Sequence, residues 1–210
     1  DGGVLMSVTV HQLAVGGFDH NFSYLAVAAN GDALLVDPTG DAEVICRAVE
    51  AAGSITPRYI LLTHGHLDHT QAVGEALGFF PAEVVAHPNH PLAGRTRLRD
   101  GQLLPFGETA VEAIFTPGHT RDSVCYRFAD DSAVFTGDVL FVGCIGFCRS
   151  KEMYNSLMKK ILPLADSLVV YSGHDYGPVP FRTLGEEKKL NPYLNCHSLE
   201  EFKAELQHLE

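Results

Sequence analysis

Short apolar runs divide the chain, and Gly, Pro, Asn and Asp residues separate one run from the next. Runs rich in Val, Ile, Leu and aromatic residues predict strands, whereas apolar positions three and four residues apart predict helices. The predicted strands are 7–13, 22–28, 33–36, 59–62, 83–86, 102–104, 110–115, 123–128, 132–136 and 167–171. The predicted helices are 42–52, 70–77, 151–162, 183–190 and 198–209.

The turns between these elements favour hairpins and a layered α/β fold. Asn30-Gly31 separates two apolar runs and is the dipeptide most typical of a tight β-hairpin. Asp41 is placed to cap the helix that follows it. Because helices are scattered among the strands, we predict a single domain over residues 1–210, with mixed or antiparallel sheets and the helices outside. Residues 178–210 form its predicted C-terminal helical extension.

The net charge, the length of the apolar runs and the cysteine content limit which classes of function the sequence favours. The 210 residues carry a formal net charge of -11, which argues against binding to nucleic acid or to an anionic membrane surface. No apolar run reaches the roughly 18 residues of a membrane-spanning helix, and no signal-peptide pattern opens the chain. The 5 cysteines are spread widely, so we expect reduced thiols and a cytoplasmic location. We interpret Met6 as the native start, with residues 1–5 a remnant ahead of it.

Residues 63–69 concentrate side chains that bind metals. The segment reads Thr-His-Gly-His-Leu-Asp-His and follows directly on the predicted strand 59–62. Its potential ligands are His64, His66, Asp68 and His69. Imidazole and carboxylate groups serve Zn, Fe and Mn alike. So many ligand side chains in one loop exceed what a chance surface cluster provides, and the segment therefore predicts a metal site.

Three later ligand-type residues also stand at the ends of predicted strands. His119, Asp138 and His174 each follow an apolar run, and a neighbouring glycine lets the backbone turn tightly beside them. Each of them alone is also typical of an ordinary loop or turn. If these strand ends meet at one edge of the fold, seven ligands converge there. That number is too large for one zinc ion and suits two.

Together these motifs resemble the metallo-β-lactamase superfamily. The His-x-His-x-Asp-His signature stands at 64–69, and the later single-ligand motifs stand at His119, Asp138 and His174. The resemblance implies a four-layer αβ/βα sandwich of two mixed sheets, with helices outside and a metal centre on one edge. In that family metal 1 would be held by His64, His66 and His119, metal 2 by Asp68, His69 and His174, and Asp138 would bridge the two.

The resemblance also implies hydrolysis. Two divalent cations, Zn with Fe or Mn as alternatives, would lower the pKa of a bridging water, and the hydroxide would attack an electrophilic carbonyl. Asp68 is the residue placed to orient this nucleophile. Residues 116–120, 135–141 and 173–176 are most similar to the glyoxalase II group of hydroxyacylglutathione hydrolases. We therefore expect a thioester or a related small ester as substrate, with glutathione-derived thioesters among the candidates.

The expected glutathione contacts are only partly present. The Lys and Tyr that hold glutathione in glyoxalase II are absent from residues 143–149. Tyr176 matches the family's tyrosine after the last histidine, which contacts glutathione. Arg149 is the candidate for a positive charge, and Phe147 is a candidate wall of the substrate groove. The family's large C-terminal helical domain is missing or reduced, which weakens glutathione thioesters as substrate more than it weakens hydrolysis.

Two other hypotheses stay open. The persulfide dioxygenases end in a sequence that resembles residues 185–192, and they use one Fe, whose ligands here would be His64, His119 and Asp138. In those enzymes an Arg follows a Cys-Gly pair, whereas this chain has a different residue at that place. The ligand count cannot separate this alternative from a hydrolase. A non-catalytic scaffold of the same fold is a remote third hypothesis, because this chain has lost none of the ligands.

Overall fold

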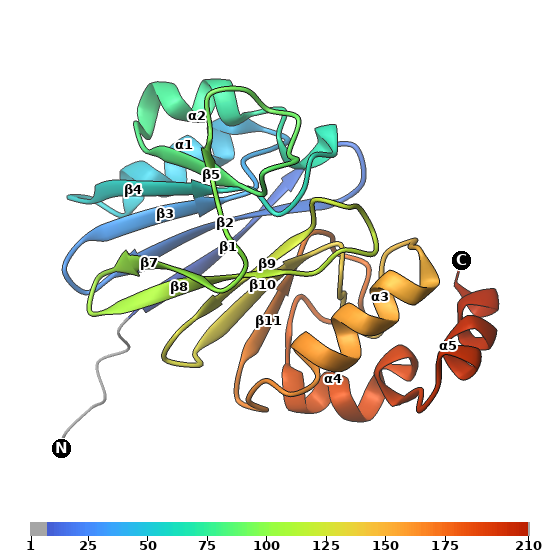
Figure 1. Cartoon of the computed structure of the whole chain (residues 1–210). Coiled ribbons are helices and arrows are strands. Elements are labelled where there is room, and N and C mark those ends of the chain that lie inside the picture. The colour runs from blue at the N-terminus through green and yellow to red at the C-terminus, as the bar shows by residue number, and fades with distance from the viewer. Residues whose placement is uncertain (1–7, 210) are drawn as a thin grey trace, which may run out of the picture.

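Two sheets of 6 strands face each other in the computed structural model, and helices cover their outer surfaces (Figure 1). The structure describes residues 8–209, so the interpretation of residues 1–5 lies outside the described residues. The first sheet has the strand order β1 (Val8–Gly16), β2 (Asn21–Ala28), β3 (Asp32–Val36), β4 (Thr56–Leu61), β5 (Glu83–Ala86) and β6 (Thr96–Arg97). The second has the order β12 (Arg182–Thr183), β11 (Val169–Ser172), β10 (Ala133–Gly137), β9 (Val124–Phe128), β8 (Thr109–Phe115) and β7 (Gln102–Phe106).

The helices form the two outer layers. α1 (Ala42–Ala51) and α2 (Val73–Phe79) pack on the first sheet, while α3 (Ser150–Ser156), α4 (Leu184–Leu190) and α5 (Leu199–Glu205) pack on the second. Single turns complete the set: η1 (Leu67–His69), η2 (Leu157–Ile161), η3 (Pro192–Asn195) and η4 (Leu206–His208). The predicted αβ/βα sandwich of two mixed sheets is confirmed. Within residues 8–209, no helix has the length and apolar character needed to cross a membrane.

Alternate residues of the central strands face different cores. In β2, Phe22 and Tyr24 pack between the two sheets, whereas Leu25 points to the helices outside. In β10, Phe135 lies between the sheets and Val134 faces the helices of the second sheet. Successive side chains of a strand point to opposite faces, and here both faces are covered. This double burial explains why these strands appear in the sequence as nearly unbroken apolar runs.

Two predicted helices differ from the observed ones. The helix expected over 70–77 begins at Val73, because the preceding residues form the single turn η1 that carries His69 into a buried position. The helix expected over 151–162 loosens in its second half, where the Leu162 amide donates to the Leu157 carbonyl at 2.8 Å. Both departures are local changes of backbone hydrogen bonding, which the spacing of apolar residues does not predict.

The strands that precede the predicted ligands end at one edge of the molecule. β10 runs parallel to β11, and both β8 and β10 run antiparallel to β9, so β8, β10 and β11 end on the same side. The first sheet joins them there. The Thr63 carbonyl accepts from the Val124 amide at 2.8 Å, and the Tyr126 hydroxyl donates to the Leu62 carbonyl at 2.7 Å. Both sheets therefore present ligand loops to a single edge.

Candidate metal centre

All seven predicted ligands lie together at this edge. They form two adjoining groups, and within each group one ligand atom per residue lies within 4.8 Å of the others. The groups are His64, His66, His119 and Asp138, and then Asp68, His69 and His174. Asp138 joins them, because its Oδ2 lies 3.4 Å from His119 Nε2 and 3.3 Å from His174 Nε2. Its Oδ1 lies 3.2 Å from His69 Nε2.

Hydrogen bonds behind the rings fix which imidazole nitrogen faces the centre. Three rings donate through Nδ1 to an oxygen outside the centre. The pairs are His69 with Asp37 Oδ2 at 2.9 Å, His119 with the Phe147 carbonyl at 2.7 Å, and His174 with the Asp19 carbonyl at 2.7 Å. Because these acceptors require the proton on Nδ1, each neutral ring presents the bare lone pair of Nε2 to the centre.

The donor atoms are packed as a cation would require. His69 Nε2 and His174 Nε2 lie 3.2 Å apart, and His66 Nδ1 lies 3.0 Å from His64 Nε2. Asp138 Oδ1 is buried and accepts no hydrogen bond. Lone pairs at these separations repel one another unless a proton or a metal ion lies between them. Imidazoles and a carboxylate arranged in this way fit a divalent transition metal.

The pKa values of several candidate ligands shift in different directions. Burial, together with the neighbouring imidazoles, lowers the pKa of His64 well below its ordinary value. Burial also works to lower the pKa of His69, but the carboxylates of Asp138 and Asp37 outweigh it and raise that pKa well above the ordinary value. Despite burial, His69 and His174 hold the pKa of Asp138 well below its usual range. A metal ion therefore has to displace protons when it enters.

Asp37 supports the centre, and the sequence analysis missed it. Its Oδ1 accepts from the Thr63 amide at 2.8 Å, while its Oδ2 accepts from the Thr63 hydroxyl at 2.5 Å and from His69 Nδ1. The residue is buried and has a positive φ of 46°. In the sequence Asp37 looks like an ordinary residue of an Asp-Pro turn. The available signal was that it too follows directly on an apolar strand.

One glycine is required by the close approach of backbone to ligand. A Cβ atom at Gly173 would lie 2.4 Å from Asp138 Oδ1 and 2.6 Å from His69 Cε1. No side chain fits at such a distance, so only glycine lets β11 end against the centre. The Gly173 carbonyl also accepts from the Phe22 amide at 2.9 Å, which ties this turn to the first sheet.

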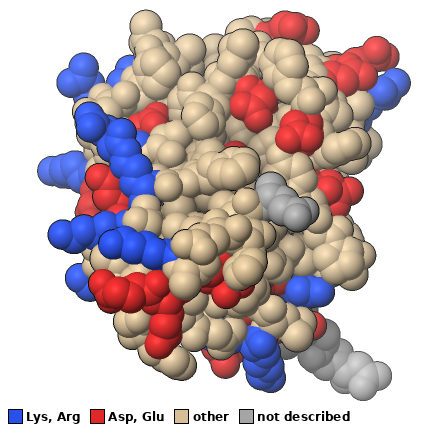
Figure 2. Space-filling view, turned by 90° about the vertical axis from the view of Figure 1, so that its right-hand side faces the viewer, with Lys and Arg blue, Asp and Glu red and all other residues tan. Residues whose placement is uncertain are grey.

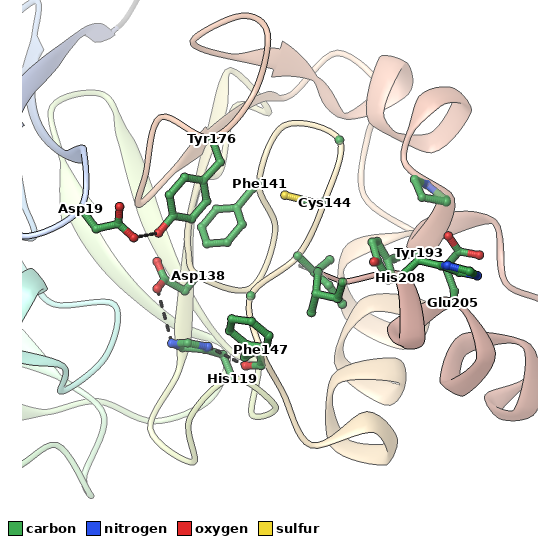
Figure 3. Close-up of a pocket in the computed structure, with 15 residues that line it drawn as sticks. Asp19, His119, Asp138, Phe141, Cys144, Phe147, Tyr176, Tyr193, Glu205 and His208 are labelled. Atoms are coloured by element: carbon green, nitrogen blue, oxygen red, sulfur yellow. Dashed lines mark hydrogen bonds and ion pairs between the residues drawn. The ribbon is translucent and has the colours of Figure 1, made fainter.

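A cavity of about 640 Å³ opens beside the centre (Figure 3). Phe147 and Tyr176, predicted as substrate contacts, both line it. Arg149 is not among the lining residues; it precedes α3, and its Nη1 lies 3.7 Å from Glu152 Oε2. Asp68 is partly exposed at the centre.

Comparison with known proteins identifies the class. Residues 16–174 match the family model described as the metallo-beta-lactamase superfamily. The chain belongs to this superfamily, as its motifs predicted.

Individual relatives show which branch of the superfamily the chain resembles. The chain is 31% identical over 220 residues to the "Probable hydroxyacylglutathione hydrolase glo2" of Schizosaccharomyces pombe, covering 88% of this chain and 86% of that protein. Its structure is similar to the crystal structure of ETHE1 from Myxococcus xanthus, with a TM-score of 0.83, 30% identity and coverage of 96% and 91%. It is also similar to TTHA1623 in a di-iron-bound form, with a TM-score of 0.73, 28% identity and coverage of 87% and 99%. These similarities confirm the predicted glyoxalase II-like or ETHE1-like branch.

Proposed function

We propose that the protein is a metal-dependent hydrolase that holds two divalent cations and cleaves a thioester or a related small ester. The observation that carries the proposal is the pair of adjoining ligand groups joined by Asp138. The relative named a hydroxyacylglutathione hydrolase supports a thioester as the substrate. Zinc, iron or manganese all suit the donor set, and the di-iron-bound neighbour supports iron as one of them.

The residues of the chain have separate roles in this reaction. His64, His66 and His119 would hold one cation, Asp68, His69 and His174 the other, and Asp138 both. The metal pair would supply a hydroxide nucleophile near neutral pH and stabilise the oxyanion of the attacked carbonyl.

Asp68 is the proposed catalytic side chain. Asn21 Nδ2 donates to Asp68 Oδ2 at 3.2 Å and so fixes the direction of this carboxylate. About a quarter of the Asp68 side chain is exposed, with a relative accessibility of 25%. It can therefore accept a hydrogen bond from the attacking water and orient it toward the substrate carbonyl.

Metal analysis combined with activity tests the proposal. We expect two metal equivalents per chain and hydrolysis of at least one acyl thioester by the loaded protein. His69→Ala should remove one equivalent and abolish hydrolysis, because His69 lies with Asp68 and His174 and is absent from the group of His64, His66, His119 and Asp138. His11→Ala, at an exposed position of β1, is the matched control and should keep both metals and activity. A chain that binds two metals and hydrolyses no thioester or ester would contradict the proposal.

The similarity to ETHE1 favours a second candidate function, an iron-dependent persulfide dioxygenase. Its iron would be held by His64, His119 and Asp138, which lie within one ligand group. The same experiment separates the two candidates. One iron per chain, retained in His69→Ala and accompanied by oxygen uptake on glutathione persulfide, would select the dioxygenase.

A further inference from the structure

The cavity beside the centre extends toward the C-terminal helices. Asp138 and His119 stand at one end, and Glu205 and His208 stand at the other (Figure 3). Four aromatic side chains line the space, namely Phe141, Phe147, Tyr176 and Tyr193. A substrate whose carbonyl reacts at the metal centre would therefore place its other arm among aromatic rings, in the direction of Glu205.

Carboxylates are prominent in the lining of the cavity, and its imidazoles are those of His119 and His208. None of its described residues is Lys or Arg, whereas Asp19 and Glu205 are acidic in addition to the ligand Asp138. Glu205 and Tyr193 both line the cavity, and burial together with the Glu205 carboxylate raises the pKa of Tyr193. Seen from the side of the C-terminal helices, most of the visible Lys and Arg side chains lie along one margin of the molecule (Figure 2). The end of the cavity away from the metal ligands, where Glu205 lies, thus favours a positive arm over a negative one.

Two arginines near the cavity each have a carboxylate partner. The Arg182 Nη1 would lie 3.9 Å from a Cβ atom at the lining residue Gly143. The same Nη1 lies 3.4 Å from Oε1 of the fully buried Glu187. Arg149 lies beside Glu152, outside the lining. Neither guanidinium is among the residues that line the cavity.

Tyr176, the one tyrosine expected to contact glutathione, already has a hydrogen-bond partner for its hydroxyl. The Tyr176 hydroxyl donates to Asp19 Oδ2. Its ring packs edge-on against Phe141, with centroids 5.0 Å apart, and stacks on His174 at 4.8 Å. Because the phenol proton is directed to Asp19, an incoming carboxylate would meet another carboxylate and no free donor. Tyr176 therefore serves the cavity as an aromatic wall.

We propose that the cavity selects thioesters whose thiol arm carries an alkylammonium group, held between the aromatic rings and Glu205, and that it rejects arms bearing carboxylates. Aromatic faces combined with a carboxylate are the groups that bind alkylammonium ions. Glutathione carries two carboxylates beside a single ammonium group, and these carboxylates would lose water beside Asp19 and Glu205 without gaining a cation from the lining. The reaction in this proposal rests on the proposed thioester hydrolase, whereas the binding preference does not.

Three thioesters with the same acetyl group test the selection on the metal-loaded protein. They are acetylthiocholine, which is cationic, S-acetyl-N-acetylcysteamine, which is neutral, and S-acetylglutathione, which carries the carboxylates. We expect kcat/KM to fall in this order, with at least about tenfold between the first and the last. Glu205→Gln should reduce the advantage of acetylthiocholine over the neutral ester by about fivefold. Glu200→Gln, at an exposed position of the same helix, should leave that advantage unchanged.

A binding measurement keeps the test independent of catalysis. Isothermal titration should show S-methylthiocholine binding more tightly than S-methylglutathione, and Glu205→Gln should weaken the binding of the former. Tighter binding and faster turnover of the glutathione compounds, or equal effects of Glu205→Gln and Glu200→Gln, would overturn the inference. A protein that hydrolyses none of the thioesters but prefers the ammonium thioether would disprove the proposed reaction and support the preference of the cavity.

Discussion

Replacing Asp37 with Asn isolates the role of a single oxygen behind the metal centre. Asn has nearly the shape of Asp and tolerates the positive φ of 46° at this position, so the backbone should be kept. The side-chain oxygen can still accept from the Thr63 amide. The new amide group, however, replaces the Oδ2 that accepts from the Thr63 hydroxyl and from His69 Nδ1. An N–H group cannot accept from His69 Nδ1–H, so the ring must move its proton to Nε2, which is its metal-binding atom.

The size of the effect follows from these contacts. Loss of a residue that orients a metal ligand typically costs about 10-fold to 100-fold in metal affinity, or about 1.4 to 2.8 kcal/mol. We expect the loss to fall on the metal held by Asp68, His69 and His174. The metal-free protein should also lose about 2 kcal/mol of unfolding free energy, because two buried hydrogen bonds to a carboxylate oxygen disappear. Asp37 also raises the pKa of His69, so the variant should retain less proton on that ring.

A competition titration with a chromophoric chelator measures the two affinities separately. Working at about pH 8 limits proton competition at His69, so that the change of tautomer dominates the difference. Asp41→Asn is the matched control, because Asp41 caps α1 through the Glu43 amide at 3.0 Å and Asn caps a helix equally well. If Asp37→Asn bound both metals within twofold of the unaltered chain, the argument that Asp37 sets the His69 tautomer would be refuted.

Three further measurements probe the packing and the charge of the centre. In urea unfolding, Gly173→Ala should lower the free energy of unfolding by about 1 to 3 kcal/mol, and it should also lower the metal content. Gly74→Ala is the control: it lies in an open helical position and should raise the free energy of unfolding by up to about 1 kcal/mol. Metal affinity should rise with pH, because the pKa values of His69 and His174 are raised and both rings keep protons that a cation must displace. Titrations between about pH 6 and 8 should show the affinity rising about tenfold per pH unit for each displaced proton. Tyr126→Phe should cost about 1 to 3 kcal/mol of unfolding free energy, because a buried carbonyl loses its donor.

The sequence predicted the parts of the fold and site that local spacing determines. Ten of the twelve strands that the structure describes were expected close to where they lie, because their buried residues appear as apolar runs, whereas the two-residue strands β6 and β12 were not predicted. The Asn30-Gly31 hairpin was expected from its turn residues, and β2 and β3 pair antiparallel around it. The candidate ligands could be predicted to lie together because a strand end fixes where the next few residues lie, and His64 and Asp138 both follow strands that end at the same edge.

The remaining features depend on contacts between distant segments. Asp37 reaches His69 across 32 positions, and Asp19 reaches Tyr176 across 157. No periodicity or turn rule connects such pairs. Arg149 was chosen for its charge alone, and the structure places it beside Glu152 and away from the cavity lining. Residues that act through position in space, and not through their neighbours in sequence, are therefore the ones that sequence patterns miss.

The metal centre and the substrate cavity differ in how far the sequence predicts them. The candidate metal ligands come from strand ends that the fold itself brings together, so their positions follow from the sandwich and the motifs. The walls of the cavity come from segments that the strand pattern leaves unconstrained: the loop with Asp19, the turn with Tyr176 and the C-terminal helix with Glu205. A change in one of these segments leaves the ligands in place and alters which substrate arm fits. The motifs therefore bear on the proposed reaction, whereas the walls of the cavity bear on the proposed choice of substrate.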